Sequence, residues 1–342
     1  MRAARAVRPS PSLPWILARI WARISVARSM VLGAVVASAV LVAAGRPDAA
    51  AESTARGAEL DRGPAGPTPV SRRRVMLELF TSQGCSSCPA ADAFVRQLPG
   101  LGFGRDRVVP LAFHVDYWDG LGWPDPFASR AFSERQRDYV RSGALADPAG
   151  ESGISGAYTP QMIIDGHVHF SGGRGDRAIA EIRRAEAERP VLDLTARAEL
   201  AGPAHDGHTV LVHVGWSFAA GATSGGAGAL PPPSTTPASG PPAPARLPSS
   251  WRLWVAVTQR AARTPVPRGE NGGETLEEAA VVRTLSPPTP LNGPAGPGPL
   301  DLRIAAPPEL AASQMEIVAF VQDLTSRRVV AVTATGLGPR GD

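Results

Sequence analysis

The chain has little cysteine, no lysine and no long apolar run. Two cysteines in 342 residues exclude a disulfide-rich scaffold and a four-cysteine zinc site. The sequence has no heptad run, no collagen period and no repeat of about 20–50 residues, so it is not a coiled coil, a collagen or a solenoid. It also lacks a phosphate-binding glycine loop, a G-x-S-x-G elbow and an H-E-x-x-H motif. The hydrophobic fraction of 43% still suffices for a core, and the length allows two domains.

The net positive charge of the chain comes from its first segment. All 35 basic residues are arginine, and seven of them lie in residues 1–51 together with one of the 31 acidic residues. Beyond residue 51, 28 arginines therefore stand against 30 acidic residues, which leaves a net charge of −2. A nucleic-acid-binding domain needs a basic face. We therefore expect no nucleic-acid partner.

Residues 1–51 have the pattern of an export signal. Arginine-rich sequence without an acidic residue precedes an apolar run at 30–44, and three alanines follow at 49–51. The run is shorter than the roughly 18–20 residues of a membrane span. We expect an exported protein, periplasmic or secreted, with an uncleaved N-terminal membrane anchor as the alternative. Residues 52–71 are polar with glycine and proline and are predicted to be a tether.

Residues 72–189 alternate strand patterns with helical patterns, and Asp165-Gly166 is a hairpin turn signal. The strands are expected at 75–80, 108–115, 161–165 and 167–170, and the helices at 90–98, 129–141 and 176–188. The order β-α-β-α-β-β-α predicts an α/β domain whose parallel or mixed sheet is covered by helices.

Residues 190–336 predict a second, β-rich domain that resembles a small sandwich. Seven short strands without helices are expected at 191–200, 209–218, 251–259, 281–285, 302–304, 316–324 and 329–335. Two stretches dominated by Pro, Gly, Ala and Ser, 219–250 and 286–299, are expected to be disordered loops.

The chemistry of the chain concentrates at Cys85-Ser86-Ser87-Cys88-Pro89, between a predicted strand and a predicted helix. The free N–H groups and the dipole at a helix N-terminus favour a thiolate. Cys85 is predicted to be the exposed attacking thiol, and Cys88, a turn deeper, to resolve the mixed disulfide. A static disulfide that pins the loop is the alternative interpretation.

Residues 114–127 are dense in aromatic, acidic, glycine and proline residues. We expect a structured loop at the edge of the sheet where α/β folds bind ligands. Trp118 and Trp123 are expected to cover the cysteines or to line a groove. His114 is a candidate to tune Cys85 or to join a metal site, and a hydrogen-bonded core histidine is the alternative.

Two further positions stand out beside predicted strands. Thr159-Pro160 immediately precedes the strand at 161–165, and an ordinary trans-proline at a strand start is one interpretation. Glu78 is the single charged residue in the strand at 75–80. An acid that reaches solvent or caps a neighbour is one interpretation of this residue.

Three segments that carry these residues, 77–92, 114–127 and 158–162, closely resemble domain of unknown function 1223 (DUF1223), a bacterial, usually exported, thioredoxin-like family. The resemblance extends over roughly residues 73–335, and the long loop at 219–250 departs from the family pattern. It implies a thioredoxin-like fold and a redox site. It implies no substrate, because the family has no assigned function.

The resemblance also implies roles for three of these residues. In thioredoxin-like domains a cis-proline faces the C-x-x-C pair, and the residue before it offers backbone hydrogen bonds to the incoming chain. Pro160 and Thr159 would take these roles. Glu78 resembles the buried carboxylate behind the second cysteine of thioredoxin. Beneath the pair, burial would raise the pKa of Glu78 and let it accept the proton of Cys88.

Three hypotheses follow for the function. The first is an exported thiol–disulfide oxidoreductase that needs no cofactor and acts on protein or small-molecule thiols and disulfides. The second is a binding protein on the same scaffold, with a structural disulfide. The third is a protein that handles Cu(I) through Cys85, Cys88 and His114, because thiolates with an imidazole suit that ion.

Overall fold

The computed structural model describes residues 73–147, 150, 156–204, 207–219, 247–291 and 300–338. The predicted export signal at 1–51, the tether at 52–71 and most of the 219–250 loop lie outside these residues. The helices are α1 (Pro89–Gln97), α2 (Arg130–Ser142) and α3 (Gly175–Glu186), with the short 3-10 helices η2 (Leu98–Leu101), η3 (Asp116–Leu121) and η4 (Ala312–Gln314). The strands are β1 (Val75–Thr81), β2 (Val108–His114), β3 (Gln161–Ile164), β4 (Val168–Ser171), β5 (Leu192–Ala204), β6 (Gly207–Phe218), β7 (Trp251–Pro265), β8 (Thr275–Leu285), β9 (Thr289–Pro290), β10 (Leu300–Ala306), β11 (Met315–Asp323) and β12 (Val329–Thr335).

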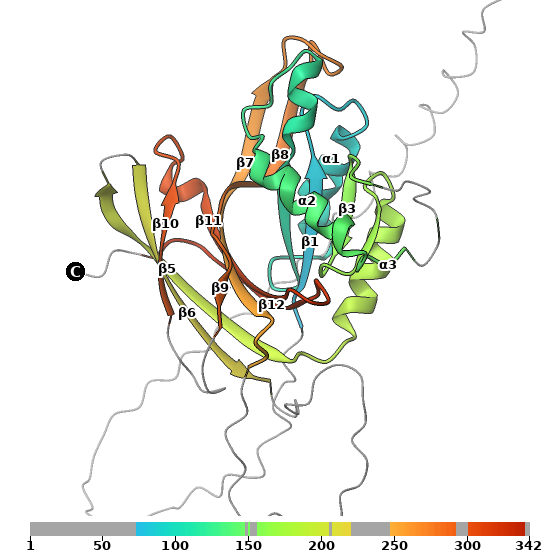
Figure 1. The fold of residues 1–342 in the computed structure, drawn as a ribbon. Helices are drawn as coiled ribbons and strands as arrows, with labels where there is room; N and C mark the ends of the chain where they lie inside the picture. Colours follow the sequence, from blue (N-terminus) through green and yellow to red (C-terminus); the bar gives the residue numbers. More distant parts are fainter. Residues whose placement is uncertain are drawn as a thin grey trace, which may run out of the picture. The chain divides into compact units, whose positions relative to one another are not determined.

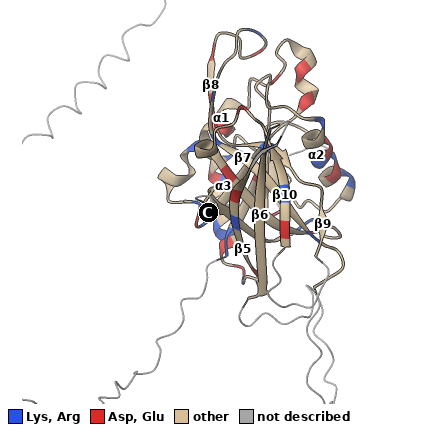
Figure 2. Cartoon of the chain, turned by 90° about the vertical axis from the view of Figure 1, so that its left-hand side faces the viewer, with Lys and Arg blue, Asp and Glu red and all other residues tan. Residues whose placement is uncertain are grey.

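The strands form two sheets. The larger sheet has the order β12-β11-β7-β8-β2-β1-β3-β4, with β9 beside β7. Strand β1 runs parallel to β2, and β2 runs parallel to β8, whereas β3 is antiparallel to β1. The smaller sheet, β10-β6-β5, is antiparallel throughout, and Figure 2 shows its three strands side by side. The predicted α/β class with a mixed sheet is confirmed.

The strands after residue 190 were expected to form a separate domain, but several of them join the sheet of the first domain. Strands β7, β8, β11 and β12 extend the first sheet, and Ala112 of β2 pairs with Val281 of β8. This pairing covers the edge that β2 would otherwise leave with unpaired backbone groups. The smaller sheet packs on the extension, and Val212 of β6 shares a core there with Val257 and Ile317. The expected sandwich is therefore formed by the smaller sheet and the extension of the larger one. The described residues belong to a single compact unit.

The alternation of side chains along β1 decides which helix each residue meets. Leu77 and Leu79 belong to the core that includes Val95 of α1 and Ile182 of α3. Phe80 belongs to the other core, where Tyr139 of α2 packs. In Figure 1, α2 crosses one side of the strands and α3 lies beyond them. Consequently, every second residue of β1 faces away from α1, the helix that begins beside the cysteines.

Two of the local predictions can be tested in the loops. Asp165 and Gly166 have φ values of 47° and 65°, and the His167 N–H donates to the Ile164 carbonyl at 3.0 Å, which confirms the predicted turn between β3 and β4. A Cβ at Gly166 would lie 2.1 Å from the carbonyl oxygen of Arg327. The predicted disordered loop at 286–299 is wrong for its first six residues, because Ser286 and Leu291 are buried and β9 lies between them. Among the described residues, no helix is both long and apolar enough to cross a membrane.

Candidate functional site

The two cysteines lie between the end of β1 and the start of α1, and they form a disulfide. The Cys85 N–H donates to the Ser82 carbonyl at 3.2 Å, and the Cys88 N–H donates to the Cys85 carbonyl at 3.1 Å. Cys88 is the N-cap of α1, and its carbonyl accepts the Asp92 N–H at 3.1 Å. Pro89 stands at the first helical position, where a missing N–H costs nothing. The disulfide therefore sits at the positive end of α1.

Both cysteines are covered. Cys85 and Cys88 each have 0% of their surface exposed, although Ser86 and Ser87 between them are exposed. The prediction that Cys85 is the exposed thiol is wrong for this oxidised structure. The Ser87 hydroxyl lies 3.3 Å from the Cys85 sulfur.

A distant part of the chain contacts the cysteine segment. Residues 266–274, which we call the β7–β8 loop, are hydrogen-bonded to this segment through Glu270 and Asn271. The Asn271 side-chain amide donates to the Gln83 carbonyl at 2.8 Å and to the Cys85 carbonyl at 3.1 Å. The Ser86 N–H donates to the Glu270 carboxylate at 2.9 Å. Because 186 residues separate Cys85 from Asn271, no local pattern could have predicted this contact.

The two predicted tryptophans both reach the cysteine segment. The Trp118 indole donates to the Thr159 hydroxyl at 2.8 Å, and its Cβ lies 3.2 Å from the position of a Cβ on Gly84. The Trp123 indole donates to the Gln83 side-chain oxygen at 3.1 Å. Trp118 thus lies between the loop before Cys85 and Thr159. Both tryptophans thus contact residues of the segment before Cys85.

The Thr159-Pro160 peptide bond is cis. The Pro160 carbonyl accepts the Gly172 N–H at 2.9 Å. A Cβ on Gly172 would lie 2.8 Å from Pro160 Cβ and 3.0 Å from Ala91 Cβ. Pro160 therefore lies close to the first turn of α1, and Thr159 lies under Trp118.

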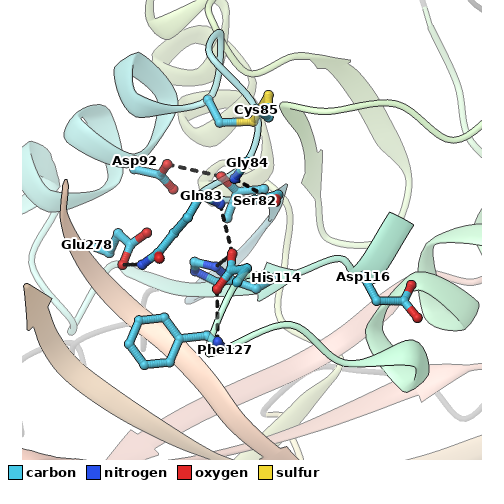
Figure 3. Close-up of polar contacts among 12 residues, drawn as sticks. Ser82, Gln83, Gly84, Cys85, Asp92, His114, Asp116, Phe127 and Glu278 are labelled. Atoms are coloured by element: carbon cyan, nitrogen blue, oxygen red, sulfur yellow. Dashed lines mark hydrogen bonds and ion pairs between the residues drawn. A yellow bond between two sulfur atoms is a disulfide. The ribbon is translucent and has the colours of Figure 1, made fainter. Parts of the chain in front are cut away.

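A cluster of buried polar side chains lies beneath the cysteine segment, and Figure 3 shows it below Cys85. Gln83 is at its centre. Its backbone N–H donates to Asp125 at 2.8 Å, and its side-chain amide donates to Glu278 at 2.9 Å. Because the Trp123 indole can only donate, it fixes the orientation of the Gln83 amide and leaves the NH2 group for Glu278. The cluster consists of Thr81, Gln83, Asp92, His114, Asp125 and Glu278.

His114 forms a buried ion pair in this cluster. Its Nδ1 lies 2.7 Å from Asp125, and both side chains are fully buried. Burial lowers the pKa of His114, but the charge and hydrogen bond of Asp125 outweigh burial and raise the pKa to about 9. The same pair lowers the pKa of Asp125 against the opposing effect of burial. His114 is therefore an imidazolium at neutral pH, and its expected role as a metal ligand competes with this pairing.

Asp92 is the acid that lies nearest to the cysteines along α1. It follows Cys88 by four residues, which places the two side chains on the same face of the helix. Burial raises the pKa of Asp92 to about 7, against the charge of His114 and the hydrogen bond of 3.0 Å from Thr81. Burial also raises the pKa of Glu278, which His114 partly offsets.

Three atoms of the cluster lack a partner within the described part of the chain: Asp92 Oδ1, His114 Nε2 and Glu278 Oε1. All three are closed off from solvent. A buried polar atom without a partner costs about 1–3 kcal/mol, and such atoms gather at sites with a chemical role. The cluster therefore combines an imidazolium, which the raised pKa of His114 favours, with two carboxyls that resist ionisation.

Glu78 does not join this cluster. It is fully buried on the other face of β1, where it accepts hydrogen bonds from Arg135 Nε at 2.6 Å and from the Tyr139 hydroxyl at 2.5 Å. The guanidinium also lies about 5 Å from several aromatic rings, which supports a structural role. Glu78 is thus buried as expected but is paired with a permanent cation on the α2 side of the sheet.

Sequence reasoning missed Asp92, Gln83, Asp125, Glu278 and the β7–β8 loop. Only Asp92 left a usable signal, because its spacing from Cys88 and from buried Val95 predicts a shared helix face. Within the described residues, no group of three or more His, Cys, Asp or Glu side chains is arranged for a metal ion. The Cu(I) hypothesis stays a prediction, and copper retained by the reduced protein but lost in Cys88→Ser would support it.

Solved structures with a similar arrangement share little sequence with this chain. HBP35 of Porphyromonas gingivalis is 12% identical, has a TM-score of 0.51, and the match covers 78% of this chain and 76% of that one. A structural genomics target from Agrobacterium tumefaciens is 22% identical with a TM-score of 0.49, covering 79% of this chain and 97% of that one. A domain of the outer membrane lipoprotein Omp28 from P. gingivalis is 16% identical with a TM-score of 0.23, covering 45% and 93%. The similarity to HBP35 is one of fold alone.

Sequence comparisons point to a single family. A comparison with curated protein sequences finds no match. A family model described as "Protein of unknown function (DUF1223)" matches residues 76–216, from β1 to β6. The matched segment contains both cysteines, His114, both loop tryptophans and the cis-proline. This match supports the placement of the chain in the DUF1223 family.

Proposed function

We propose that the protein is an exported thioredoxin-like thiol–disulfide oxidoreductase. One observation carries the proposal: the Cys85–Cys88 disulfide stands at the N-terminus of α1, one helical turn before the buried carboxyl of Asp92. The helix N-terminus favours a thiolate at the pair. Export rests on the sequence pattern of residues 1–51.

In the reducing direction, the thiolate of Cys85 attacks a disulfide of the client. A bond forms between Cys85 and one client sulfur, and the other client sulfur leaves as a thiolate and is protonated. The Cys88 thiol then loses its proton and attacks Cys85, which forms the Cys85–Cys88 disulfide and releases the second client sulfur. Two electrons pass from the pair to the client. The reverse sequence oxidises a client dithiol.

Asp92 is the group best placed to take the proton of Cys88. Its position on the same helix face brings its carboxyl toward the cysteine, because Cβ atoms in a helix tilt toward the N-terminus. A general base works best when its pKa lies near the working pH, and the pKa of Asp92 is about 7. This role was expected of Glu78, which Arg135 holds on the other face of the sheet.

Thr159 and Pro160 are proposed to position the client. Pro160 lies near the first turn of α1 through their common neighbour Gly172, and Trp118 holds the Thr159 side chain. The backbone of Thr159 would then offer hydrogen bonds to an extended client segment. The clients are protein or small-molecule thiols and disulfides.

The reduction potential of the pair tests the proposal. The full chain is equilibrated in dithiothreitol or glutathione buffers, and the thiols are counted by mass after alkylation. We expect a potential between about −120 and −270 mV, the range of proteins that exchange disulfides. A potential below about −300 mV is typical of a structural disulfide and would refute the proposal.

The complete burial of both cysteines favours a second candidate, a binding protein with a structural disulfide. A fold alone does not determine an activity. Replacing Cys85 by Ser separates the two candidates. An oxidoreductase loses all exchange with Cys85→Ser, whereas a binding protein keeps its ligand.

A further inference from the structure

The β7–β8 loop is attached to the cysteine segment by a charged group. The Glu270 side chain is exposed, yet its carboxylate accepts the Ser86 N–H at 2.9 Å, and this bond lowers the pKa of Glu270. Ser86 directly follows Cys85. A full negative charge therefore lies one residue away from the sulfur that is proposed to become a thiolate.

The oxidation state of the cysteine pair determines whether the Glu270 carboxylate meets a second negative charge. A disulfide is neutral, so the Glu270 carboxylate meets no opposing charge from the cysteines in the closed structure. Reduction creates a thiolate at Cys85, and two negative charges so close together repel each other. The loop is held by few other bonds to this segment, chiefly the two from the Asn271 amide to Gln83 and Cys85.

The same loop is bonded to the segment that carries the buried sulfurs. Neither cysteine has exposed surface while the loop is closed, and exchange requires a client sulfur to approach Cys85 in line with the disulfide. Asn271 is a buried residue of the loop, and its side-chain amide bonds the loop to the cysteine segment. Because both sulfurs are buried, some of the residues around them must move before a bulky client can react.

We propose that the β7–β8 loop is a redox-sensitive lid, which Glu270 and Asn271 hold closed over the disulfide and which the Cys85 thiolate opens. This inference rests on the proposed exchange chemistry. The coupling is reciprocal: closure of the lid disfavours reduction by the same free energy by which reduction disfavours closure. Glu270 therefore makes the pair harder to reduce, and reduction loosens the loop.

Three variants of the full chain test the lid. Glu270→Gln keeps a hydrogen-bond acceptor but removes the charge, Asn271→Ala removes the amide bonds, and Glu274→Gln is the control. Glu274 lies on the same loop and is exposed, so its replacement removes the same charge without touching Ser86. Each variant is equilibrated with dithiothreitol, which supplies the two electrons and is oxidised to its cyclic disulfide.

We expect Glu270→Gln to shift the equilibrium toward the dithiol by about three- to tenfold relative to Glu274→Gln, or up to about 30 mV. Asn271→Ala should increase the rate of reduction by a bulky dithiol by about tenfold, because two hydrogen bonds no longer close the lid. Hydrogen exchange of residues 266–274 should be faster in the reduced wild type than in the oxidised one. This redox difference should shrink in Glu270→Gln.

Equal equilibria for Glu270→Gln and Glu274→Gln would overturn the lid, as would identical exchange of residues 266–274 in both redox states. These outcomes leave the proposed function intact, since the wild-type potential would still lie in the exchange range. Conversely, a wild-type potential below about −300 mV refutes the proposed function. Even then, the equilibria of Glu270→Gln and Glu274→Gln can be compared, so the failure of the lid and the failure of the proposed function are distinguishable.

Discussion

Replacing Asp92 by Asn should change how the stability of the oxidised protein depends on pH. The pKa of Asp92 is about 7 in the folded protein, compared with an ordinary value of 3.8. Below pH 3.8 the carboxyl is protonated in both the folded and the unfolded chain and affects neither. As the pH rises, the unfolded chain releases the proton first, so folding loses stability until the pH passes about 7.

The expected size follows from the difference in pKa. Each unit is worth about 1.36 kcal/mol, so burial of this carboxyl costs about 4 kcal/mol at pH 8 compared with acidic solution. Asparagine cannot ionise and keeps an oxygen that can accept the Thr81 hydroxyl. We therefore expect the free energy of unfolding of Asp92→Asn, relative to wild type, to rise by about 4 kcal/mol between pH 4 and pH 8.

Urea denaturation of the oxidised full chain at several pH values measures this difference. Subtracting wild type from variant cancels the titrating groups that do not interact with Asp92, whereas His114, Glu278 and Asp125 are coupled to it. Asp106→Asn, at an exposed position, serves as the control for the loss of a carboxylate charge. If the gap between wild type and Asp92→Asn is the same at pH 4 and pH 8, the carboxyl is not protonated near neutrality, and its proposed role as the proton acceptor of Cys88 is refuted.

Further predictions concern the neighbouring buried groups. Glu78→Gln leaves the buried Arg135 without its opposite charge and should lower the free energy of unfolding by about 3–5 kcal/mol. The disulfide equilibrium should change by less than about threefold. A larger change would indicate that Glu78 acts on the cysteine pair. Asp125→Asn should lower the pKa of His114 from about 9, as NMR titration can measure. The stability that His114 contributes in wild type is complete below pH 6.5 and is lost as the pH rises through about 9, and this loss should disappear in Asp125→Asn. Gly166→Ala should destabilise by more than about 2 kcal/mol in thermal denaturation, because it combines a positive φ with a backbone clash.

The elements of the first half were predictable because their signals are local. The strand before Cys85 and the turn at Asp165-Gly166 depend on residues that are near one another in the chain. The position of Thr159-Pro160 before β3 was also readable, and the resemblance to a known family supplied the cis geometry. Local patterns of this kind reflect the backbone preferences of a few neighbouring residues.

The choice of the buried acid could not be made from the sequence. A strand alternates its faces, but the pattern of β1 does not say which face meets α1 and which meets α2. Glu78 therefore stood as a candidate although it pairs with Arg135, a residue 57 positions away. Asp92 lies on a helix where a polar residue ordinarily faces solvent, and only its spacing from Cys88 indicated otherwise.

The exposure of the cysteines was wrongly predicted for a related reason. A cysteine pair at the start of a helix is open to solvent unless another part of the chain covers it. Here the loop between β7 and β8 contacts the segment that carries the cysteines, and those strands also join the first sheet instead of forming a separate domain. Strand pairings over such distances are not contained in any short window of sequence.

The origin of the cover sets an order of events in the life of the chain. Ser86 leaves the ribosome 184 residues ahead of Glu270, so the contact between them cannot form until that intervening stretch has been made. The half of the chain up to α3 also emerges with one edge of β2 bare, since its neighbour β8 is made much later. The surroundings of the cysteine pair and the edge of the first sheet are thus both completed only late in synthesis.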